Sequence, residues 1–118
     1  MQYMLLIYGN EAGMQSATPS DIEQMVAAYG AYTQALKAAG ILLGSDRLRP
    51  SSAATTVRIT NGKTAVLNGP YAETREQLGG YYAIDVPDLD AAISWAARCP
   101  GAAHGSMEVR PVWAMSHA

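Results

Sequence analysis

The chain has 118 residues, of which 49% are hydrophobic and 15% are charged, and its formal net charge is −2. This composition is typical of one globular domain with a hydrophobic core, and it excludes a disordered chain. The eight basic residues are scattered along the sequence, whereas nucleic-acid-binding domains gather theirs on one face, so we expect no direct contact with nucleic acid.

The cysteine content and the first residues of the chain indicate a compartment. Cys99 is the single cysteine and cannot form an internal disulfide, which suits a reducing cytoplasm. The first residues lack the charge and apolar run of a signal peptide. Their longest apolar stretch, MLLIY, is far shorter than the ~20 residues that cross a bilayer. We therefore expect a cytoplasmic protein without membrane contact.

The first third of the chain predicts a strand, a loop and a helix. Residues 3–8 (YMLLIY) are apolar on both faces, which predicts a central strand buried on two sides. Residues 9–17 are small and polar and predict a loop. Thr18 and Asp21 have the spacing of a capping box, and Gly40 is suited to a left-handed C-cap, so a helix is expected between them. The apolar stripe expected to pack in the core is Ile22, Met25, Val26, Tyr29, Tyr32 and Leu36.

The middle of the chain predicts a strand and a hairpin. Residues 41–48 are expected to form a strand that is interrupted at Gly44-Ser45-Asp46. Asn61-Gly62 separates two further strand-like segments, residues 55–60 and 63–67. This dipeptide favours a tight β-hairpin because both turn positions need a positive φ.

The last third predicts a strand, a helix and a strand. Residues 79–86 are expected to form a strand with Tyr81 and Tyr82 on opposite faces. Asp88 is expected to cap a helix that Pro100-Gly101 stops. The stripe expected to be buried is Leu89, Ala92, Ile93 and Ala96. Residues 107–111 alternate between apolar and polar, as in a half-buried strand.

This order of elements predicts the fold class. Two βαβ-type units and a mostly antiparallel sheet describe an α+β, ferredoxin-like sandwich with an extra β-hairpin. We expect a single domain over residues 1–114 and a frayed C-terminal tail over residues 115–118.

The segment NGPYAETREQLGGY, residues 68–81, resembles the signature of the DGPF-domain proteins. These proteins are a branch of the YCII-related (YciI-like) family, and their pattern begins Asp-Gly-Pro-Phe. The segments YMLLIY, VPDLDAAISWAARCP and MEVRPV are also similar, so the resemblance covers nearly the whole chain. It implies a ferredoxin-like fold, a homodimer and a possible association with sigma factors, and it implies no established reaction.

The resemblance also implies that the family uses an acid–base pair. Many members of the family carry a histidine on the first helix and a downstream aspartate. Tyr29 stands at the position that matches the histidine, and the next acid is Asp46. Asn68 replaces the first aspartate of the signature. No histidine lies on the first helix, so the aspartate-polarised imidazole of the family's pair is absent.

The signature segment supplies the candidate ligand-binding residues. They are Asn68, Gly69, Pro70, Tyr71, Glu73, Thr74, Arg75, Glu76, Gly79 and Gly80. A turn at residues 68–70 and a solvated or dimer-contacting surface at residues 73–76 are the structural alternatives. Gly79-Gly80 indicates a bulge or a close backbone approach. His104 and His117 share no metal-ligand spacing with Cys99 or an acid, so no metal and no other cofactor is expected.

Three functional hypotheses remain open at this point. The first is a small homodimeric module that binds a small ligand or has a regulatory role. The second is an enzyme acting on a small metabolite, which requires Tyr29, Asp46 and Arg110 to converge on one cleft. The third is an interaction protein linked to sigma-factor-dependent transcription. The architecture alone does not separate them, because this fold hosts many functions.

Overall fold

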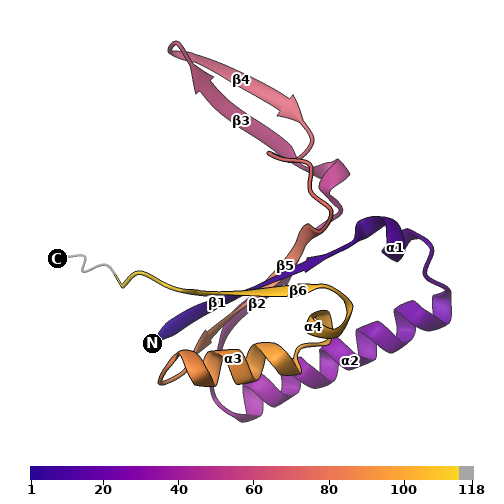
Figure 1. The fold of residues 1–118 in the computed structure, drawn as a ribbon, viewed down its shortest axis with the longest axis vertical. Coiled ribbons are helices and arrows are strands. Elements are labelled where there is room, and N and C mark those ends of the chain that lie inside the picture. Colours follow the sequence, from indigo (N-terminus) through magenta and orange to yellow (C-terminus); the bar gives the residue numbers. More distant parts are fainter. Residues whose placement is uncertain (115–118) are drawn as a thin grey trace.

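The computed structural model describes residues 1–114 and shows a four-stranded sheet with helices on one side (Figure 1). The elements in chain order are β1 (Gln2–Gly9), α1 (Glu11–Gln15), α2 (Pro19–Ala38), β2 (Leu42–Arg47), a short 3-10 helix (Ser51–Ala53), β3 (Thr55–Thr60), β4 (Lys63–Asn68), β5 (Gln77–Asp85), α3 (Leu89–Arg98), α4 (Pro100–His104) and β6 (Ser106–Pro111). The sheet has the strand order β2-β5-β1-β6, with all neighbours antiparallel. The predicted ferredoxin-like α+β fold with its extra hairpin is confirmed. The expected fraying of residues 115–118 lies outside the described residues.

The hydrophobic core lies between the sheet and the helical layer. Its buried members are Tyr3, Leu5, Tyr32, Leu36, Tyr82, Ile84, Val86, Ala92, Ala96 and Cys99. The Tyr32 ring meets the Tyr82 ring edge-on at 5.1 Å between centroids, and the Tyr32 hydroxyl donates to the Trp95 carbonyl oxygen at 2.7 Å. These contacts join α2, β5 and α3, and they satisfy the buried hydroxyl of Tyr32.

Within residues 1–114, helices cover only one face of the sheet. Along β1, Tyr3 and Leu5 are buried toward the helices, so Met4 and Leu6 point to the opposite side, where they are half-buried. The expectation that residues 3–8 are buried on both sides is therefore wrong for a single chain. We call the uncovered side the open face. Its central side chains are Met4, Leu6 and Tyr8 of β1 with Tyr81 and Ala83 of β5.

The predicted ends of α2 are confirmed, but its apolar stripe is only partly buried. The Thr18 hydroxyl accepts from the Asp21 amide and the Asp21 carboxylate accepts from the Thr18 amide, which completes the capping box. Gly40 takes a φ of +72° after the helix. Ile22 and Val26 are 44% and 59% exposed, because the first half of α2 extends beyond the sheet (Figure 1).

Some expected boundaries differ from the structure. Residues 9–17 contain α1, because the Asn10 side chain accepts from the Gly13 amide and caps a helical turn. Pro100-Gly101 follows the end of α3 but also begins α4, since proline fits a first helical turn. Residues 44–46 continue β2 rather than interrupt it, and the irregularity lies between Leu42 and Gly44.

The predicted cap of α3 is confirmed, and its predicted stripe is half correct. The Asp88 carboxylate accepts from the Ala91 amide at 2.9 Å. Ala92 and Ala96 are buried, whereas Leu89 and Ile93 are each 49% exposed.

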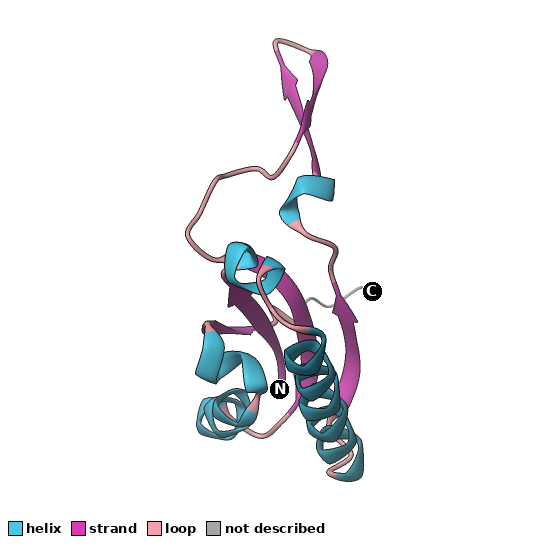
Figure 2. Ribbon diagram, turned by 90° about the vertical axis from the view of Figure 1, so that its right-hand side faces the viewer, coloured by secondary structure: helices cyan, strands magenta, loops and turns pink. Residues whose placement is uncertain are grey.

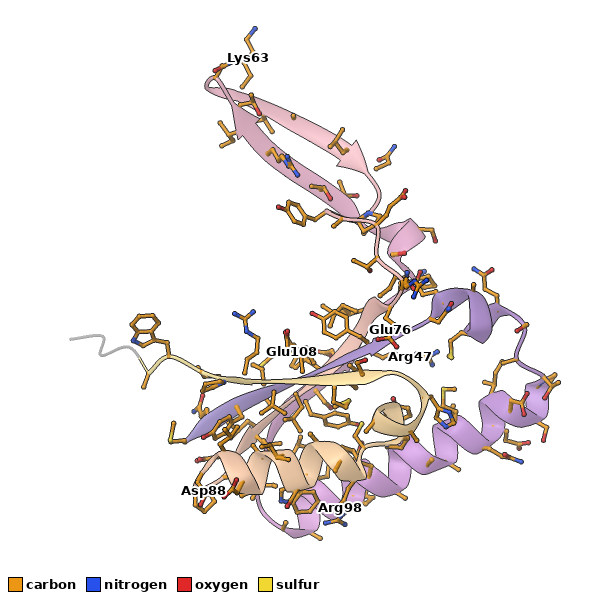
Figure 3. All side chains as sticks on the ribbon, viewed as in Figure 1. Arg47, Lys63, Glu76, Asp88, Arg98 and Glu108 are labelled. Carbon is orange, nitrogen blue, oxygen red and sulfur yellow. The ribbon has the colours of Figure 1, made fainter. Side chains whose placement is uncertain are left out.

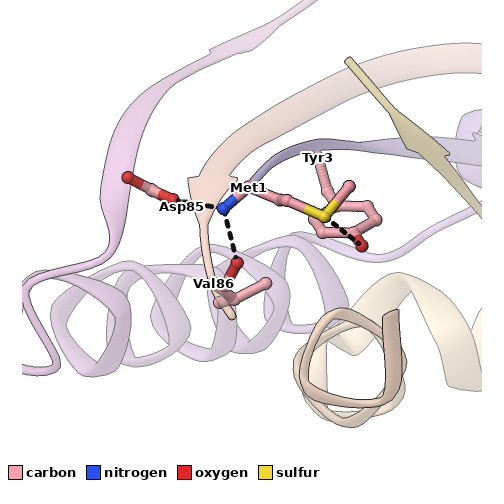
Figure 4. A network of polar contacts seen from close by, with 4 residues as sticks. All are labelled: Met1, Tyr3, Asp85 and Val86. Atoms are coloured by element: carbon pink, nitrogen blue, oxygen red, sulfur yellow. Dashed lines mark hydrogen bonds and ion pairs between the residues drawn. The ribbon is translucent and has the colours of Figure 1, made fainter. Parts of the chain in front are cut away.

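The N-terminus is held at the end of β5. The Met1 ammonium group donates to the Asp85 carboxylate at 3.1 Å and to the Val86 carbonyl at 2.9 Å (Figure 4).

The hairpin formed by β3 and β4, residues 55–68, projects from the rest of the chain, and we call it the arm. Asn61 and Gly62 have φ values of 52° and 75°, as the sequence predicts for the hairpin turn. Figures 1 and 2 show the arm extending from the side of the sheet that is opposite the helices. The radius of gyration is 16.4 Å, whereas a compact domain of this length has roughly 13–14 Å. The arm therefore makes few contacts within its own chain.

Candidate functional site

A groove of about 820 Å³ lies where the arm meets the sheet. It is bounded by the end of β1, the loop before the arm, the base of β3 and the signature segment. Its lining residues are Tyr8, Leu48, Arg49, Pro50, Ser51, Ala53, Ala54, Thr55, Thr56, Val57, Pro70, Tyr71, Ala72, Thr74, Gln77 and Leu78. These walls are mostly apolar, with a few hydroxyl and amide groups and one charged residue, Arg49. Small-molecule sites in proteins have this kind of lining.

Glu11 fixes one wall of the groove to the body of the protein. Its carboxylate accepts from the Ser51 amide and from the Ser51 hydroxyl, both at 2.6 Å. The Glu11 amide donates to the Gln77 side-chain oxygen at 3.0 Å. Hydrogen bonds to an ionised carboxylate are stronger than those between neutral groups. Glu11 therefore links α1, the 3-10 helix that precedes the arm, and the start of β5.

The first half of the signature segment forms part of the groove. Gly69 has a φ of +113°, its amide donates to the Ala54 carbonyl at 2.7 Å, and its carbonyl accepts from the Thr56 hydroxyl at 2.9 Å. A side chain is disfavoured at this φ, which explains the glycine. Asn68 is the last residue of β4 and pairs with Thr55. The chain leaves the arm here, and Pro70 and Tyr71 then line the groove.

The second half of the signature segment has other contacts. The Glu76 carboxylate accepts from the Ser106 hydroxyl at 2.6 Å and so ties the segment to β6. Arg75 and Glu76 border a second hollow together with Asn10. Glu73 is exposed, and Thr74 lines the groove. Figure 3 shows Glu76 at the level where the arm leaves the sheet.

The predicted bulge and close approach at Gly79-Gly80 are both confirmed. β1 pairs Ile7 with Gly80 and Tyr8 with Leu78, so Gly79 is the extra residue of a bulge. A Cβ atom on Gly80 would lie 2.7 Å from the Asp46 carbonyl oxygen of β2. Both glycines therefore have a structural reason that does not involve a ligand.

Asp46 and Arg110 lie on the open face, near its two edges. Asp46 is opposite Tyr81 on β2, and the Tyr81 hydroxyl donates to the Asp46 carboxylate at 2.7 Å. This hydrogen bond, together with the negative charge of Asp46, raises the pKa of Tyr81. Arg110 is opposite Met4 on β6, at the other edge of the sheet. Three strand spacings separate the edges, which is about 14 Å.

Tyr29 lies on the other side of the sheet. It packs against the hydrophobic core, and a Cβ atom on buried Gly101 would lie 2.8 Å from its hydroxyl. Burial raises the pKa of Tyr29 to about 12, and nearby Cys99 adds to the effect. The expectation that Tyr29, Asp46 and Arg110 converge on one cleft is therefore wrong. A hydroxyl with this pKa also stays protonated near neutral pH, which makes it a poor general base.

Basic side chains outnumber acidic ones in one stretch of the chain. Residues 47–75 contain five basic side chains, Arg47, Arg49, Arg58, Lys63 and Arg75, and one acidic side chain, Glu73. The rest of the chain contains three basic side chains against nine acidic ones. Figure 3 shows Lys63 at the tip of the arm, and Glu108 on the side of the sheet away from the helices. Of these five basic residues, Arg58 and Lys63 belong to the arm and Arg49 lines the groove.

Several residues that line the groove or hold its wall in place have no signal in the sequence. Glu11 and Ser51 are 40 residues apart and belong to segments that read as plain loops. Arg49 belongs to no motif.

Within residues 1–114, no cluster of three or more histidine, cysteine or acidic side chains is arranged to hold a metal ion. Of the helices in this same range, none is both long and apolar enough to cross a bilayer.

The chain is similar to known proteins over nearly its whole length. A model of the YCII-related domain matches residues 1–116. The chain is also similar to an uncharacterized protein of Rhizobium meliloti (strain 1021), with 38% identity over 114 residues. This alignment covers 95% of the chain and 92% of the relative. Both matches run through the helices, the sheet and the arm, and so they include the groove.

Proposed function

The chain belongs to the YCII-related family, and we propose that it acts as a homodimeric module that binds a small organic anion in the groove at the base of the arm. The observation on which this depends is the lining of the groove. Arg49 is the one charged residue among largely apolar walls. A ligand with an apolar body and a carboxylate or phosphate group matches this pattern.

The charges around the groove support an anionic ligand. Five of the eight basic residues of the chain fall within residues 47–75. The Arg58 guanidinium lies 5.0 Å from the centroid of the Tyr71 ring, so one of these cations is held beside a lining residue. A local excess of positive charge raises the concentration of anions near the site.

The open face supports the homodimer. Its centre is apolar, with Met4, Leu6 and Ala83, and its rim carries Asp46, Glu108 and Arg110. An apolar centre within a charged rim is typical of a protein–protein interface. Tyr8 and Leu78 pair on this face and also line the groove. A second copy on the open face would therefore close one side of the groove.

A thermal-shift screen with small organic acids and phosphorylated metabolites tests the ligand. A compound at 100 times its Kd adds about 2.7 kcal/mol to the free energy of unfolding, which raises the Tm by roughly 10 °C. The shift should be saturable, and Arg49→Gln should weaken it by about tenfold in Kd. Lys37→Gln, on α2 and outside the groove, should leave it unchanged. An equal shift in the Arg49 and Lys37 variants would contradict the groove as the site.

The finer family assignment is also a proposal. We place the chain in the DGPF-domain branch on the strength of Asn68-Gly69-Pro70-Tyr71 and the Gly79-Gly80 strand that follows. We also propose a cytoplasmic location, which the free cysteine Cys99 supports. The sigma-factor association stays a prediction. The enzymatic alternative is not proposed, because Tyr29 lies on the helix side of the sheet and does not converge with Asp46 and Arg110.

A further inference from the structure

Tyr71 presents an aromatic ring at the border of the groove. Its side chain is 77% exposed, and it is one of the residues that line the groove. The Arg58 guanidinium of β3 lies over the ring, 5.0 Å from its centroid. A cation at this distance is attracted to the face of an aromatic ring. Arg58 therefore covers one face of the ring, and the high exposure of Tyr71 means that the other face is open.

The backbone before Tyr71 holds the ring in this position. The Gly69 amide donates to the Ala54 carbonyl at 2.7 Å, and the Gly69 carbonyl accepts from the Thr56 hydroxyl at 2.9 Å. Thr56 and Arg58 are two positions apart in β3, so they share one face of the arm. Residues 69–71 therefore run along that face. The ring is positioned before any ligand arrives, which lowers the entropic cost of binding.

The open face of the ring suits a planar group of a ligand. Aromatic rings attract one another in offset-stacked arrangements, and stacking on an aromatic side chain is a common way for proteins to bind flat groups. The neighbouring lining residues Val57, Pro70 and Leu78 have apolar side chains. A flat aromatic ring would thus meet the Tyr71 ring on one side and apolar groups around it.

Arg49 selects the charge of the ligand. It is the one charged residue that lines the groove, and a guanidinium can bind a carboxylate through two parallel hydrogen bonds. A phosphate monoester carries about −1.5 to −2 charges near neutral pH. A single arginine would leave part of that charge unpaired beside apolar walls, which is unfavourable. The lining therefore favours a carboxylate over a phosphate.

We propose that the groove binds planar aromatic carboxylates, with the ring stacked on the open face of Tyr71 and the carboxylate paired with Arg49. This inference rests on the proposed function and names the ligand class of the same site. Arg58 is then a positioning residue, because it holds the Tyr71 ring from behind and does not touch the ligand. The volume of about 820 Å³ is ample for such a compound.

NMR titration of the protein with three probes tests the ligand class. The probes are phenylacetate, its saturated analogue cyclohexylacetate, and benzyl phosphate. The wild type should bind phenylacetate roughly threefold to tenfold more tightly than cyclohexylacetate, because only the aromatic ring can stack. It should also bind phenylacetate more tightly than benzyl phosphate. Arg49→Gln should weaken the binding of phenylacetate by about tenfold.

Variants of Tyr71 and of the arm locate the stacking. Tyr71→Leu keeps an apolar side chain but should remove the preference for phenylacetate over cyclohexylacetate, whereas Tyr71→Phe should keep it. Arg58→Gln should reduce the preference by roughly twofold, because the ring loses its support. Lys63→Gln removes a charge from the same face of the arm and should leave the preference unchanged. Circular dichroism checks that each variant keeps the wild-type fold.

The Tyr71 ring resonances report the contact directly. They should move upfield when phenylacetate is added, because the ring current of a stacked aromatic group shields them, and cyclohexylacetate should leave them in place. Tyr71→Phe assigns these resonances. Tyr71 resonances that stay unchanged while phenylacetate saturates the groove would overturn the inference.

The outcomes separate this inference from the proposed function. If phenylacetate and cyclohexylacetate bind equally and Arg49→Gln weakens both, the groove binds organic anions but the aromatic class is wrong. If the preference persists in Tyr71→Leu, the ligand does not stack on Tyr71 and the inference is overturned. Tighter binding of benzyl phosphate than of phenylacetate would overturn the choice of a carboxylate. If neither these probes nor any other organic anion binds, the proposed ligand site and this inference are both wrong.

Discussion

The hydroxyl of Tyr81 donates a 2.7 Å hydrogen bond to the carboxylate of Asp46 across the neighbouring strands β5 and β2. Both side chains lie on the open face, at the edge opposite Arg110. The pair presents a carboxylate and a phenol together where we place the dimer interface. It also offers a direct spectroscopic probe of that face.

The ionisation of Tyr81 should respond to Asp46. The hydrogen bond to the carboxylate and the charge of the carboxylate both raise the pKa of Tyr81, because they favour the protonated phenol. Asp46→Asn removes the charge and should bring this pKa back toward ~10. An NMR titration of the tyrosine rings measures it, with Tyr81→Phe to assign the signal. Asp85→Asn, whose carboxylate contacts Met1 instead, is the control, and an equal Tyr81 pKa in both variants would contradict the contact.

Tyr29 should make the protein sensitive to alkaline pH. Burial raises its pKa to about 12 in the folded state, against ~10 in an unfolded chain. The stability from this shift is fully present below pH ~10 and is lost as pH rises through ~12, because the unfolded state releases the proton first. Urea unfolding across this range should show a steeper loss for the wild type than for Tyr29→Phe, by ~1 kcal/mol after allowance for partial exposure. Met25→Leu, on the same helix, should behave as the wild type, and identical slopes for all three proteins would refute the shift.

The sequence predicted the local features of the fold well. Thr18, Asp21 and Gly40 mark the ends of α2, and Asn61-Gly62 marks the turn of the arm, because each requires a particular backbone geometry or hydrogen bond. The bulge at Gly79 follows from the same kind of reasoning. Each signal depends on residues within a few positions of one another, so no knowledge of the tertiary structure is needed.

The sequence alone did not predict the long-range contacts and the burial that form the candidate site. Periodicity shows which side chains share a face, but it does not show what covers that face, so Met4 and Ile22 were expected in the core. The contact between Glu11 and Ser51 joins segments 40 residues apart. The side of the sheet to which Tyr29 and Asp46 belong depends on strand pairing, and a shift of one residue in register reverses it.

Gly105 should tolerate no side chain. A Cβ atom at this position would overlap the carbonyl oxygen of Tyr8, which is backbone and cannot turn away. Gly105→Ala should therefore lower the free energy of unfolding by about 1–3 kcal/mol, in the range of an overpacked site. Gly30→Ala is the matched change, since an added Cβ there has no neighbour within 4 Å. In the middle of α2 it should stabilise the protein by about 0.5–1 kcal/mol. Chemical denaturation measures both, and equal effects would rule out the overlap.

Glu11 should control the local stability of the groove wall. Glu11→Gln keeps the shape of the side chain but replaces a carboxylate oxygen that now accepts from Ser51 with an amide nitrogen that donates. The loss of charge-assisted hydrogen bonds should cost about 1–3 kcal/mol. The effect should be concentrated at the 3-10 helix before the arm, because Glu11 joins that helix to α1. Amide hydrogen exchange should therefore speed up at Ser51 and at Ala53 and Ala54, whose amides close the adjacent 3-10 turn. Glu23→Gln, on the exposed surface of α2, is the control, and unchanged exchange at these three amides in Glu11→Gln would show that another contact positions the arm.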